Sequence, residues 1–100
     1  MYNRLNEFTK VTVYPMYFDK HETDHGELMI GQDKKVIRFL CPCGCGKEIF
    51  LTTKEYSDTP GRNWTIKVED GKVTLHPSIN AWRLPCKSHY WIRENRIIWV

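Results

Sequence analysis

The chain has 100 residues, of which 41% are hydrophobic and 27% charged, and its formal net charge is +3. These values are typical of one soluble globular domain and predict a single domain over residues 1–100. The charge is too small to indicate nucleic-acid binding, and no apolar run approaches the roughly 18 residues that cross a membrane. The first seven residues lack the apolar core of a secretion signal, so we expect a cytoplasmic protein with reduced thiols.

Alternating apolar and polar residues predict β-strands along most of the chain. The first alternates through Val11 and Val13, and the second and third enter and leave a cysteine-rich turn. In chain order, the expected strands are 10–14, 36–40, 48–53, 64–68, 73–75, 89–92 and 97–100. Only residues 53–57 have the pattern of a helical turn.

Two dipeptides mark hairpins between consecutive strands. Asp70-Gly71 stands between the fourth and fifth strands, and Glu94-Asn95 stands between the sixth and seventh. A glycine tolerates the positive φ that a tight hairpin turn requires. The sequence therefore predicts a mainly β fold, a compact antiparallel sheet domain, with a small α+β fold as the alternative.

The cysteines form the most informative pattern of the chain. Cys41, Cys43 and Cys45 fall at alternate positions, and Cys86 follows beside His89. Neighbouring thiols at this spacing are poorly placed for relaxed disulfides with one another, which need Cα atoms ~4.4–6.8 Å apart and defined dihedrals. Through a glycine-containing turn they can converge on one soft metal ion. The sequence therefore predicts one structural zinc ion that staples the domain.

Five side chains compete for the four places around this zinc ion. One ligand set is Cys41, Cys43, Cys45 and Cys86, which leaves His89 free. The alternative is a set of three cysteines with His89 as the fourth ligand. Either set closes the tetrahedron, so both indicate a structural metal. A catalytic metal would need one of these ligands to stay away.

A literal His-Glu-x-x-His run covers residues 21–25. In zinc peptidases this spacing works on a helix, which places both imidazoles on one face. Here no apolar stripe surrounds the run that would anchor such a helix, and no third ligand follows. We interpret it as a chance match.

The chain also contains a nucleophile and a base. A serine hydroxyl becomes a good nucleophile when an imidazole takes its proton. Ser88 adjoins His89, but neighbours on a strand point to opposite faces. Ser78, which we expect in an irregular turn after Pro77, is therefore the candidate partner of His89. No carboxylate can be chosen from the sequence to orient the histidine.

Three runs of this chain resemble the BubE-like family. They are Cys-Pro-Cys-Gly-Cys-Gly over 41–46, Pro-Ser-Ile over 77–79, and Trp-Arg-Leu-Pro-Cys-Lys-Ser-His-Tyr-Trp-Ile over 82–92, followed by a closing Ile-Trp strand. The resemblance covers about residues 27–100 and is strongest over 36–100. This family was first described as a domain of unknown function, and its members occur in bacterial ubiquitin-like (Bub) operons beside E1-like and E2-like enzymes.

The resemblance implies a deubiquitinase-like peptidase or isopeptidase that acts on a bacterial ubiquitin-like protein or its conjugates. Ser78 matches the family's Pro-Ser-Ile serine and His89 its Ser-His-Tyr histidine, while the four cysteines match its metal-binding motif. We therefore expect Ser78 as nucleophile and His89 as general base. One departure stands beside Ser78: the family pattern reads Pro-Ser-Ile-Gly-Asn, whereas Ile79 is followed here by Asn80 directly.

Two other functions stay open on the residues alone. One is a non-catalytic, zinc-stapled module that binds a protein or nucleic acid through its aromatic and basic C-terminal half. The other is a metallopeptidase with an open zinc site. Chelation separates these readings, because removing a structural zinc unfolds the domain whereas removing a catalytic one stops only the activity.

Overall fold

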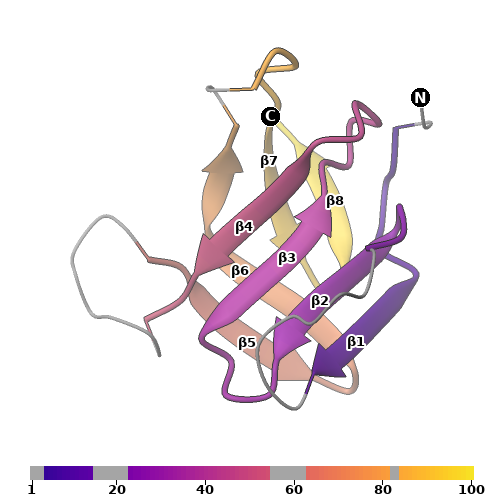
Figure 1. Cartoon of the computed structure of the whole chain (residues 1–100). Coiled ribbons are helices and arrows are strands. Elements are labelled where there is room, and N and C mark those ends of the chain that lie inside the picture. Colours follow the sequence, from indigo (N-terminus) through magenta and orange to yellow (C-terminus); the bar gives the residue numbers. More distant parts are fainter. Residues whose placement is uncertain (1–3, 15–22, 55–62, 82–83) are drawn as a thin grey trace.

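Two four-stranded sheets make up the described part of the chain (Figure 1). The computed structural model describes residues 4–14, 23–54, 63–81 and 84–100. Its strands are β1 (Lys10–Tyr14), β2 (Glu27–Gly31), β3 (Val36–Leu40), β4 (Glu48–Thr52), β5 (Thr65–Glu69), β6 (Lys72–Asn80), β7 (His89–Arg93) and β8 (Arg96–Trp99). Within these residues the chain has no helix, and so none that could span a membrane. The predicted mainly β fold is confirmed.

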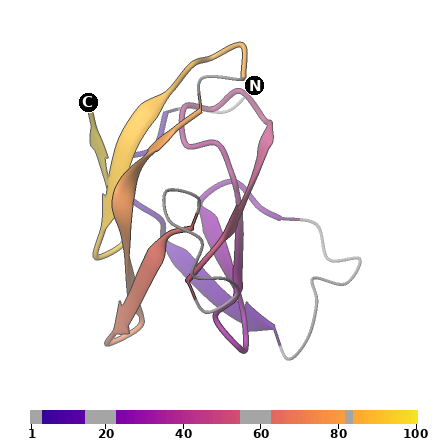
Figure 2. The same ribbon diagram turned by 90° about the vertical axis from the view of Figure 1, so that its left-hand side faces the viewer.

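The two sheets face each other as layers (Figure 2). The first has the strand order β1-β2-β3-β4 and the second the order β5-β6-β7-β8. Neighbouring strands are antiparallel except β1 and β2, which are parallel from Lys10↔Glu27 to Tyr14↔Gly31. This pair departs from the purely antiparallel sheet that we expected. Residues 15–26 connect the two strands, and a parallel pair requires a connection of about that length.

The sequence analysis missed β2. All five of its residues are buried, so the strand shows no alternation of apolar and polar positions. The inward residues Leu28 and Ile30 belong to the core between the sheets, while Met29 is covered on the other face, where Thr23 Oγ1 lies 2.8 Å from its sulfur. Periodicity cannot reveal a strand that is covered on both faces.

The strand β6 is longer than the predicted 73–75 and contains Ser78. The expectation of an irregular turn after Pro77 is therefore wrong. The pairing of β6 with β7 shifts between Leu75 and Ile79, which is a β-bulge, and Pro77 lies within this irregular stretch. Proline is tolerated in a sheet where no ladder hydrogen bond is needed from its nitrogen, so the strand continues past it.

Apolar side chains from both sheets fill the space between the layers. Phe8 and Phe39 meet edge to face with ring centroids 5.3 Å apart, and Tyr90 meets Trp99 in the same way at 5.3 Å. The largest core side chains are Phe8, Leu28, Ile30, Ile37, Phe39, Leu75, Tyr90 and Ile92. This core fixes the sheets against each other and thereby the positions of the loops that extend beyond them.

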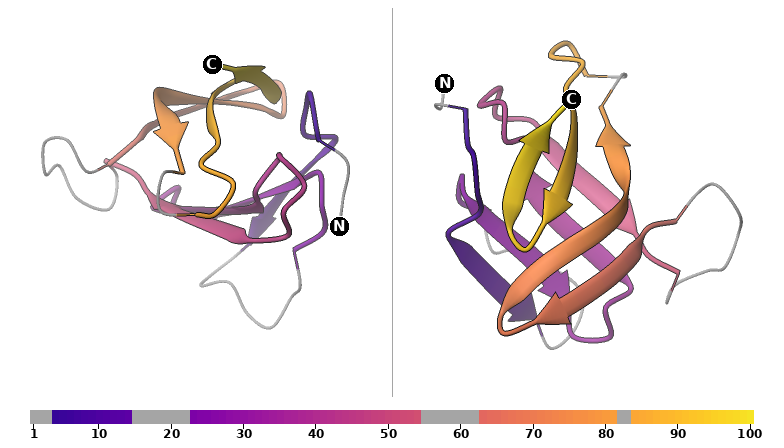
Figure 3. Two further views of the ribbon diagram at one scale, coloured as in Figure 1. Left: turned by 90° about the horizontal axis from the view of Figure 1, so that it is seen from above. Right: turned by 180° about the vertical axis from the view of Figure 1, so that it is seen from behind.

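The turn between β3 and β4 and the connection between β6 and β7 lie at the same end of the molecule, at the top of Figure 1. Seen from above, in the left panel of Figure 3, the two loops lie over the space between the layers. Cys41, Cys43 and Cys45 belong to the first loop, and Cys86 belongs to the second. The fold therefore brings together cysteines that are far apart in the sequence.

Candidate functional site: a cysteine cluster and a serine–histidine pair

The first three cysteines stand on a tight turn that closes the β3–β4 hairpin. The Cys41 N–H donates to the carbonyl of Lys47 over 2.8 Å, and the Gly44 N–H donates to the carbonyl of Cys41 over 3.1 Å. Gly44 and Gly46 have φ values of 94° and 81°, a region that favours glycine. The two glycines allow the chain to reverse within a few residues, so the three thiols converge on one point.

Cys86 reaches the same point from a second turn. The Leu84 N–H donates to the Ala81 carbonyl and the Lys87 N–H donates to the Leu84 carbonyl, each over 3.0 Å. The Ala81 N–H donates to the Ser88 carbonyl over 2.7 Å and closes the base of this loop. The loop is thus tied to the start of β7, where His89 follows.

The four cysteines form one group that can hold a metal ion. Their Sγ atoms all lie within 4.8 Å of one another, and all four thiols are free. The separation of Cys41 Sγ from Cys43 Sγ is 3.4 Å, and Cys86 Sγ lies 3.8 Å from both Cys41 Sγ and Cys45 Sγ. Cys41 is buried and the others are partly buried. His89 is not a member of this group.

The protein environment affects these thiols unequally. Burial raises the pKa of Cys41 and Cys45 above the usual thiol range. Burial acts in the same direction on Cys86 and is the largest single influence there. Hydrogen bonds with Ser88, Cys43 and Cys41 together outweigh it and lower the pKa of Cys86 to about 7. Of these three thiols, Cys86 therefore loses its proton most easily near neutral pH. A bound cation would deprotonate the others, since a coordinating thiol is held as the thiolate.

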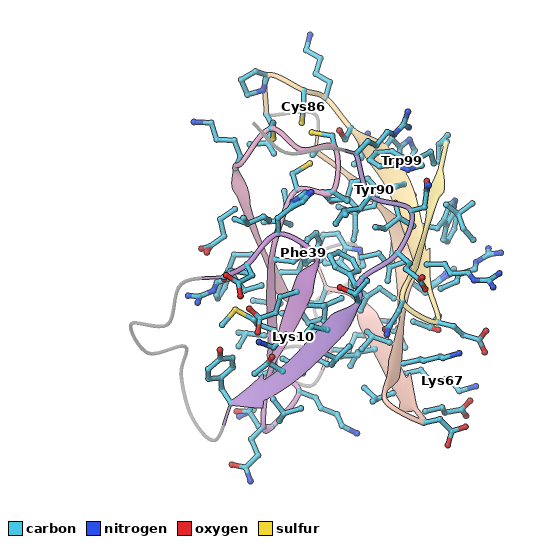
Figure 4. The ribbon with its side chains drawn as sticks, turned by 90° about the vertical axis from the view of Figure 1, so that its right-hand side faces the viewer. Lys10, Phe39, Lys67, Cys86, Tyr90 and Trp99 are labelled. Carbon is cyan, nitrogen blue, oxygen red and sulfur yellow. The ribbon has the colours of Figure 1, made fainter. Side chains whose placement is uncertain are left out.

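The Tyr90 side chain interacts with this cluster, through the thiols of Cys41 and Cys86. Figure 4 labels Tyr90 and Cys86 in the same half of the molecule. The Tyr90 hydroxyl is buried and forms no hydrogen bond with the protein's described nitrogen and oxygen atoms. Burial and the neighbouring Cys41 and Cys86 thiols raise the pKa of Tyr90, so the hydroxyl keeps its proton. It can donate that proton in a hydrogen bond to a thiolate of a loaded site. The sequence could have indicated that Tyr90 is buried beside the cysteines. Side chains alternate along β7, so Tyr90 points to the face opposite His89, which is the inner one.

Ser78 and His89 meet on the outer face of the second sheet. The Ser78 Oγ lies 2.8 Å from Nε2 of His89, and both side chains are half-buried. Their strands β6 and β7 are paired with Ile79 opposite Tyr90 and Asn80 opposite His89. This register, together with the bulge before Ile79, brings the serine and the imidazole to hydrogen-bonding distance. The two residues that the sequence analysis paired are therefore in contact.

The main chain of His89 is held firmly, whereas its ring has no acidic neighbour in the described structure. The Val100 N–H donates to the His89 carbonyl over 3.1 Å, so the β7–β8 ladder continues to this residue. Ser78 is the hydrogen-bonding partner of the ring, and no described carboxylate lies within hydrogen-bonding or ion-pairing distance of it. The arrangement is thus a dyad within the residues that the structure describes.

An open pocket of about 380 Å³ lies beside His89. Within it the Arg4 guanidinium stacks 3.7 Å from the centroid of the Trp99 ring. The pocket is lined by Arg4, Cys43, Cys86, Lys87, Ser88, His89, Trp99 and Val100. Since Ser78 does not line it, the pocket approaches the dyad from the histidine side only.

The His-Glu-x-x-His run does not form a metal site in the described residues. His25 lies in a turn before β2, and it is not part of the cysteine group. His21 and Glu22 lie outside the described residues. Because two of the three motif side chains lie outside the described residues, the chance match stays an interpretation.

Comparison with known families gives a match to BubE, described as a bacterial ubiquitination-like system serine protease, over residues 14–100. Comparison with curated proteins and with solved structures gave no significant match. The family match spans the cysteine group and the Ser78–His89 pair, and it starts earlier in the chain than the resemblance that we noted from the motifs. The chain therefore belongs to the BubE family of bacterial ubiquitination-like system serine proteases.

Proposed function

We propose that this protein is a serine peptidase in which Ser78 is the nucleophile and His89 is the general base. The observation that carries the proposal is the 2.8 Å separation of Ser78 Oγ and His89 Nε2. A base must lie within about 2.6–3.2 Å of the proton that it removes, and this pair meets that requirement before any substrate is bound. Membership of a serine protease family supports the same assignment.

The reaction follows from the geometry of the pair. His89 carries its ring proton on Nδ1, so that Nε2 accepts the hydroxyl proton of Ser78 as Oγ attacks the scissile carbonyl carbon. The resulting imidazolium then gives this proton to the leaving amine, and the acyl group stays on Ser78 as an ester. Water attacks the ester with His89 again as base, which releases the acid and restores the serine.

The oxyanion of this reaction needs donors beside Ser78. The strand β5 pairs with β6 as far as Thr65↔His76, so within the described part of the chain the edge of β6 is uncovered from Pro77 onward. Because the Ala81 N–H points toward β7, the main-chain groups of Asn80 point away from β7 to this uncovered edge. We assign the oxyanion donors to N–H groups of this edge, next to Ser78.

We further propose that the cysteine group binds one structural Zn²⁺. Four thiolates ~2.3 Å from a tetrahedral zinc ion are separated from one another by roughly 3.8 Å. The Sγ separations of 3.4 Å and 3.8 Å fit this geometry, and the buried Tyr90 hydroxyl offers a donor to the thiolates. With Cys41, Cys43, Cys45 and Cys86 as ligands the coordination is complete, so the ion supplies stability rather than a reactive position.

In this proposal the zinc ion also positions the base. Cys86 is three residues before His89, and the β6–β7 connection that carries Cys86 is closed at its base by the hydrogen bond from the Ala81 N–H to the Ser88 carbonyl. Anchoring Cys86 to the β3–β4 turn thus holds the first residue of β7 from one side. The hydrogen bond from Val100 holds it from the other.

We infer that the substrate is a ubiquitin-like protein or its conjugates, cleaved after the tail of that protein. This inference rests on the family, whose description places its members in a bacterial ubiquitination-like system. The cytoplasm is the matching compartment, since four reduced thiols are needed to hold the metal.

The test is covalent labelling of the zinc-loaded protein with a biotinylated fluorophosphonate, followed by digestion and mass spectrometry. We expect the adduct on Ser78, no adduct in Ser78→Ala, and strongly reduced labelling in His89→Ala. Thr65→Ala, which removes an exposed hydroxyl from the neighbouring strand, should label like the wild type. A folded, zinc-loaded wild type that stays unlabelled would contradict the proposal and favour a non-catalytic, zinc-stapled binding module.

A further inference from the structure

The outer face of the second sheet carries an ordered set of side chains next to the dyad. This face is turned to the viewer in the right panel of Figure 3. Along β7, alternation places His89, Trp91 and Arg93 on it. The pairing of β7 with β8 sets Ile98 opposite Trp91 and Arg96 opposite Arg93. We define the outer strip as Trp91, Ile98, Arg93 and Arg96.

The half of the outer strip closer to the dyad is apolar. Ile98 is a large aliphatic side chain that is 41% exposed. The Trp91 ring is half-buried and lies between the His76 ring, 5.6 Å away, and the Arg93 guanidinium, 5.1 Å from its centroid. Trp91 and Ile98 therefore form an aromatic–aliphatic surface that begins directly beyond His89.

The half farther from the dyad is positively charged and has no acidic partner among the described residues. Arg93 and Arg96 stand directly opposite each other, and like charges in such a pair destabilise a sheet. Glu94 lies in the turn between them, and Glu7 forms an isolated bridge with Arg96. Neither carboxylate comes within ion-pairing distance of either arginine in the described structure. The two guanidinium groups are thus available to an anion from outside.

We propose that the outer strip binds the extended segment of the substrate that precedes the scissile bond, and that it selects apolar residues followed, farther from the bond, by acidic ones. This inference rests on the proposed peptidase function, because it takes Ser78 and His89 as the point of cleavage. A peptidase that releases one protein from varied conjugates must recognise the segment that all its substrates share. That segment is the tail of the released protein, which supplies the scissile carbonyl.

Strand geometry sets the spacing of this preference. Residues of a strand are ~3.3 Å apart, so Trp91 lies roughly 7 Å and Arg93 roughly 13 Å beyond His89. An extended peptide advances by a similar length for each residue. Apolar side chains are therefore expected at about the second and third residues from the scissile carbonyl, and carboxylates at about the fourth and fifth.

The experiment measures peptide binding to the Ser78→Ala protein, which keeps the surface and cannot cleave. Three labelled peptides are compared by fluorescence anisotropy: one with two leucines followed outward by two glutamates, one with glutamines for the glutamates, and one with serines for the leucines. We expect the first to bind at least about tenfold more tightly than either of the others, and its affinity to fall with added salt.

Charge-reversal variants locate the effect. Arg93→Glu with Arg96→Glu should remove the preference for glutamate over glutamine, and the single variants Arg93→Gln and Arg96→Gln should each weaken it. The matched control is Lys35→Glu, which reverses one exposed charge at the β2–β3 turn of the other sheet and should change nothing. Ile98→Ser should weaken binding of both leucine-containing peptides.

Equal affinity for the glutamate and glutamine peptides, or an effect of Lys35→Glu as large as that of the arginine variants, would overturn the inference. Undetectable binding of all three peptides would overturn it as well. Failure of the proposed function is a separate result, since it is read from fluorophosphonate labelling of the wild type. A labelled enzyme without the acidic preference contradicts the outer strip alone, and an unlabelled protein with that preference contradicts the peptidase alone.

Discussion

The cysteine group and the Ser78–His89 pair are adjoining clusters with opposite character. Cys86 and His89 belong to the same loop and strand start, yet Cys86 turns to a group of thiols that are buried or partly buried, whereas His89 turns to the outer face of the sheet. The thiols are close enough to surround one ion completely. The histidine contacts the hydroxyl of Ser78, which is half-buried.

This difference separates stability from chemistry. In the proposed zinc site, four thiolates leave no position for substrate, so the contribution of the cysteine group would be to hold two loops together. The dyad contributes little to the core and has the hydrogen bond that a nucleophile and its base require. Variants in the two clusters should therefore behave in opposite ways, and the predictions below test that contrast.

Removal of the metal ligand should give the largest effect. Cys86→Ser, or chelation of the wild type, should release zinc and abolish the cooperative thermal transition, because structural zinc contributes about 10–16 kcal/mol to folding in small domains. Ser78→Ala should keep full zinc content and an unchanged Tm. Zinc analysis with calorimetry measures both. A chelated protein that retains the wild-type Tm would mean that the cysteine group does not stabilise the fold.

Loss of the base should remove activity and leave the metal in place. His89→Ala should lower kcat/KM, or the rate of fluorophosphonate labelling, by roughly 10³-fold or more, since the hydroxyl loses its proton acceptor. Zinc content should stay that of the wild type, because His89 is not among the grouped thiols. Loss of zinc in this variant, with retention in Cys45→Ala, would instead make the histidine the fourth ligand and remove the base from the dyad.

The features that the sequence predicted correctly are those set by a few neighbouring residues. The hairpins at Asp70-Gly71 and Glu94-Asn95 form as expected, and all four residues have positive φ. Three members of the cysteine group were predictable for a similar reason, because Cys41, Cys43 and Cys45 lie within one short turn, whereas the position of Cys86 beside them depends on the fold. In both cases the information is contained in a few consecutive residues.

The missed features depend on tertiary contacts. The strand β2 is covered on both faces, so its pattern has no period, and its parallel pairing with β1 leaves no mark in either segment. Pro77 looked like the end of a strand, yet β6 continues because the bulge before Ile79 accommodates it. The distance between Ser78 and His89 depends on this same bulge, which no local pattern reports.

Zinc affinity should depend on pH through the buried thiols. Burial raises the pKa of Cys41 and that of Cys45, so both thiols are protonated at neutral pH, and zinc must displace these protons. Affinity should therefore rise with pH, by roughly tenfold per pH unit for each proton displaced. Competition with a chromophoric chelator between pH 6 and pH 8 measures it. A pH-independent affinity would mean that the thiols are already ionised before the metal binds.

The substitution Tyr90→Phe should give the smallest effect of these variants. It is also the sharpest test of whether the cysteine group influences the Ser78–His89 pair. If the Tyr90 hydroxyl donates to a zinc-bound thiolate, Tyr90→Phe removes that hydrogen bond without changing the shape of the core. The loss should be about 1 kcal/mol, or about fivefold in the zinc Kd. The matched control is Tyr14→Phe, which removes a buried hydroxyl from β1 in the other sheet and should leave the zinc Kd unchanged.

The sign of the Tyr90→Phe effect decides between two roles for the hydroxyl. A buried hydroxyl without any partner is unfavourable, so its removal would strengthen the domain and leave zinc binding unchanged or tighter. Weaker zinc binding with unchanged labelling of Ser78 assigns Tyr90 to the metal cluster alone. Weaker zinc binding together with slower labelling would show that the thiolate cluster, through Cys86 and the start of β7, controls the position of His89.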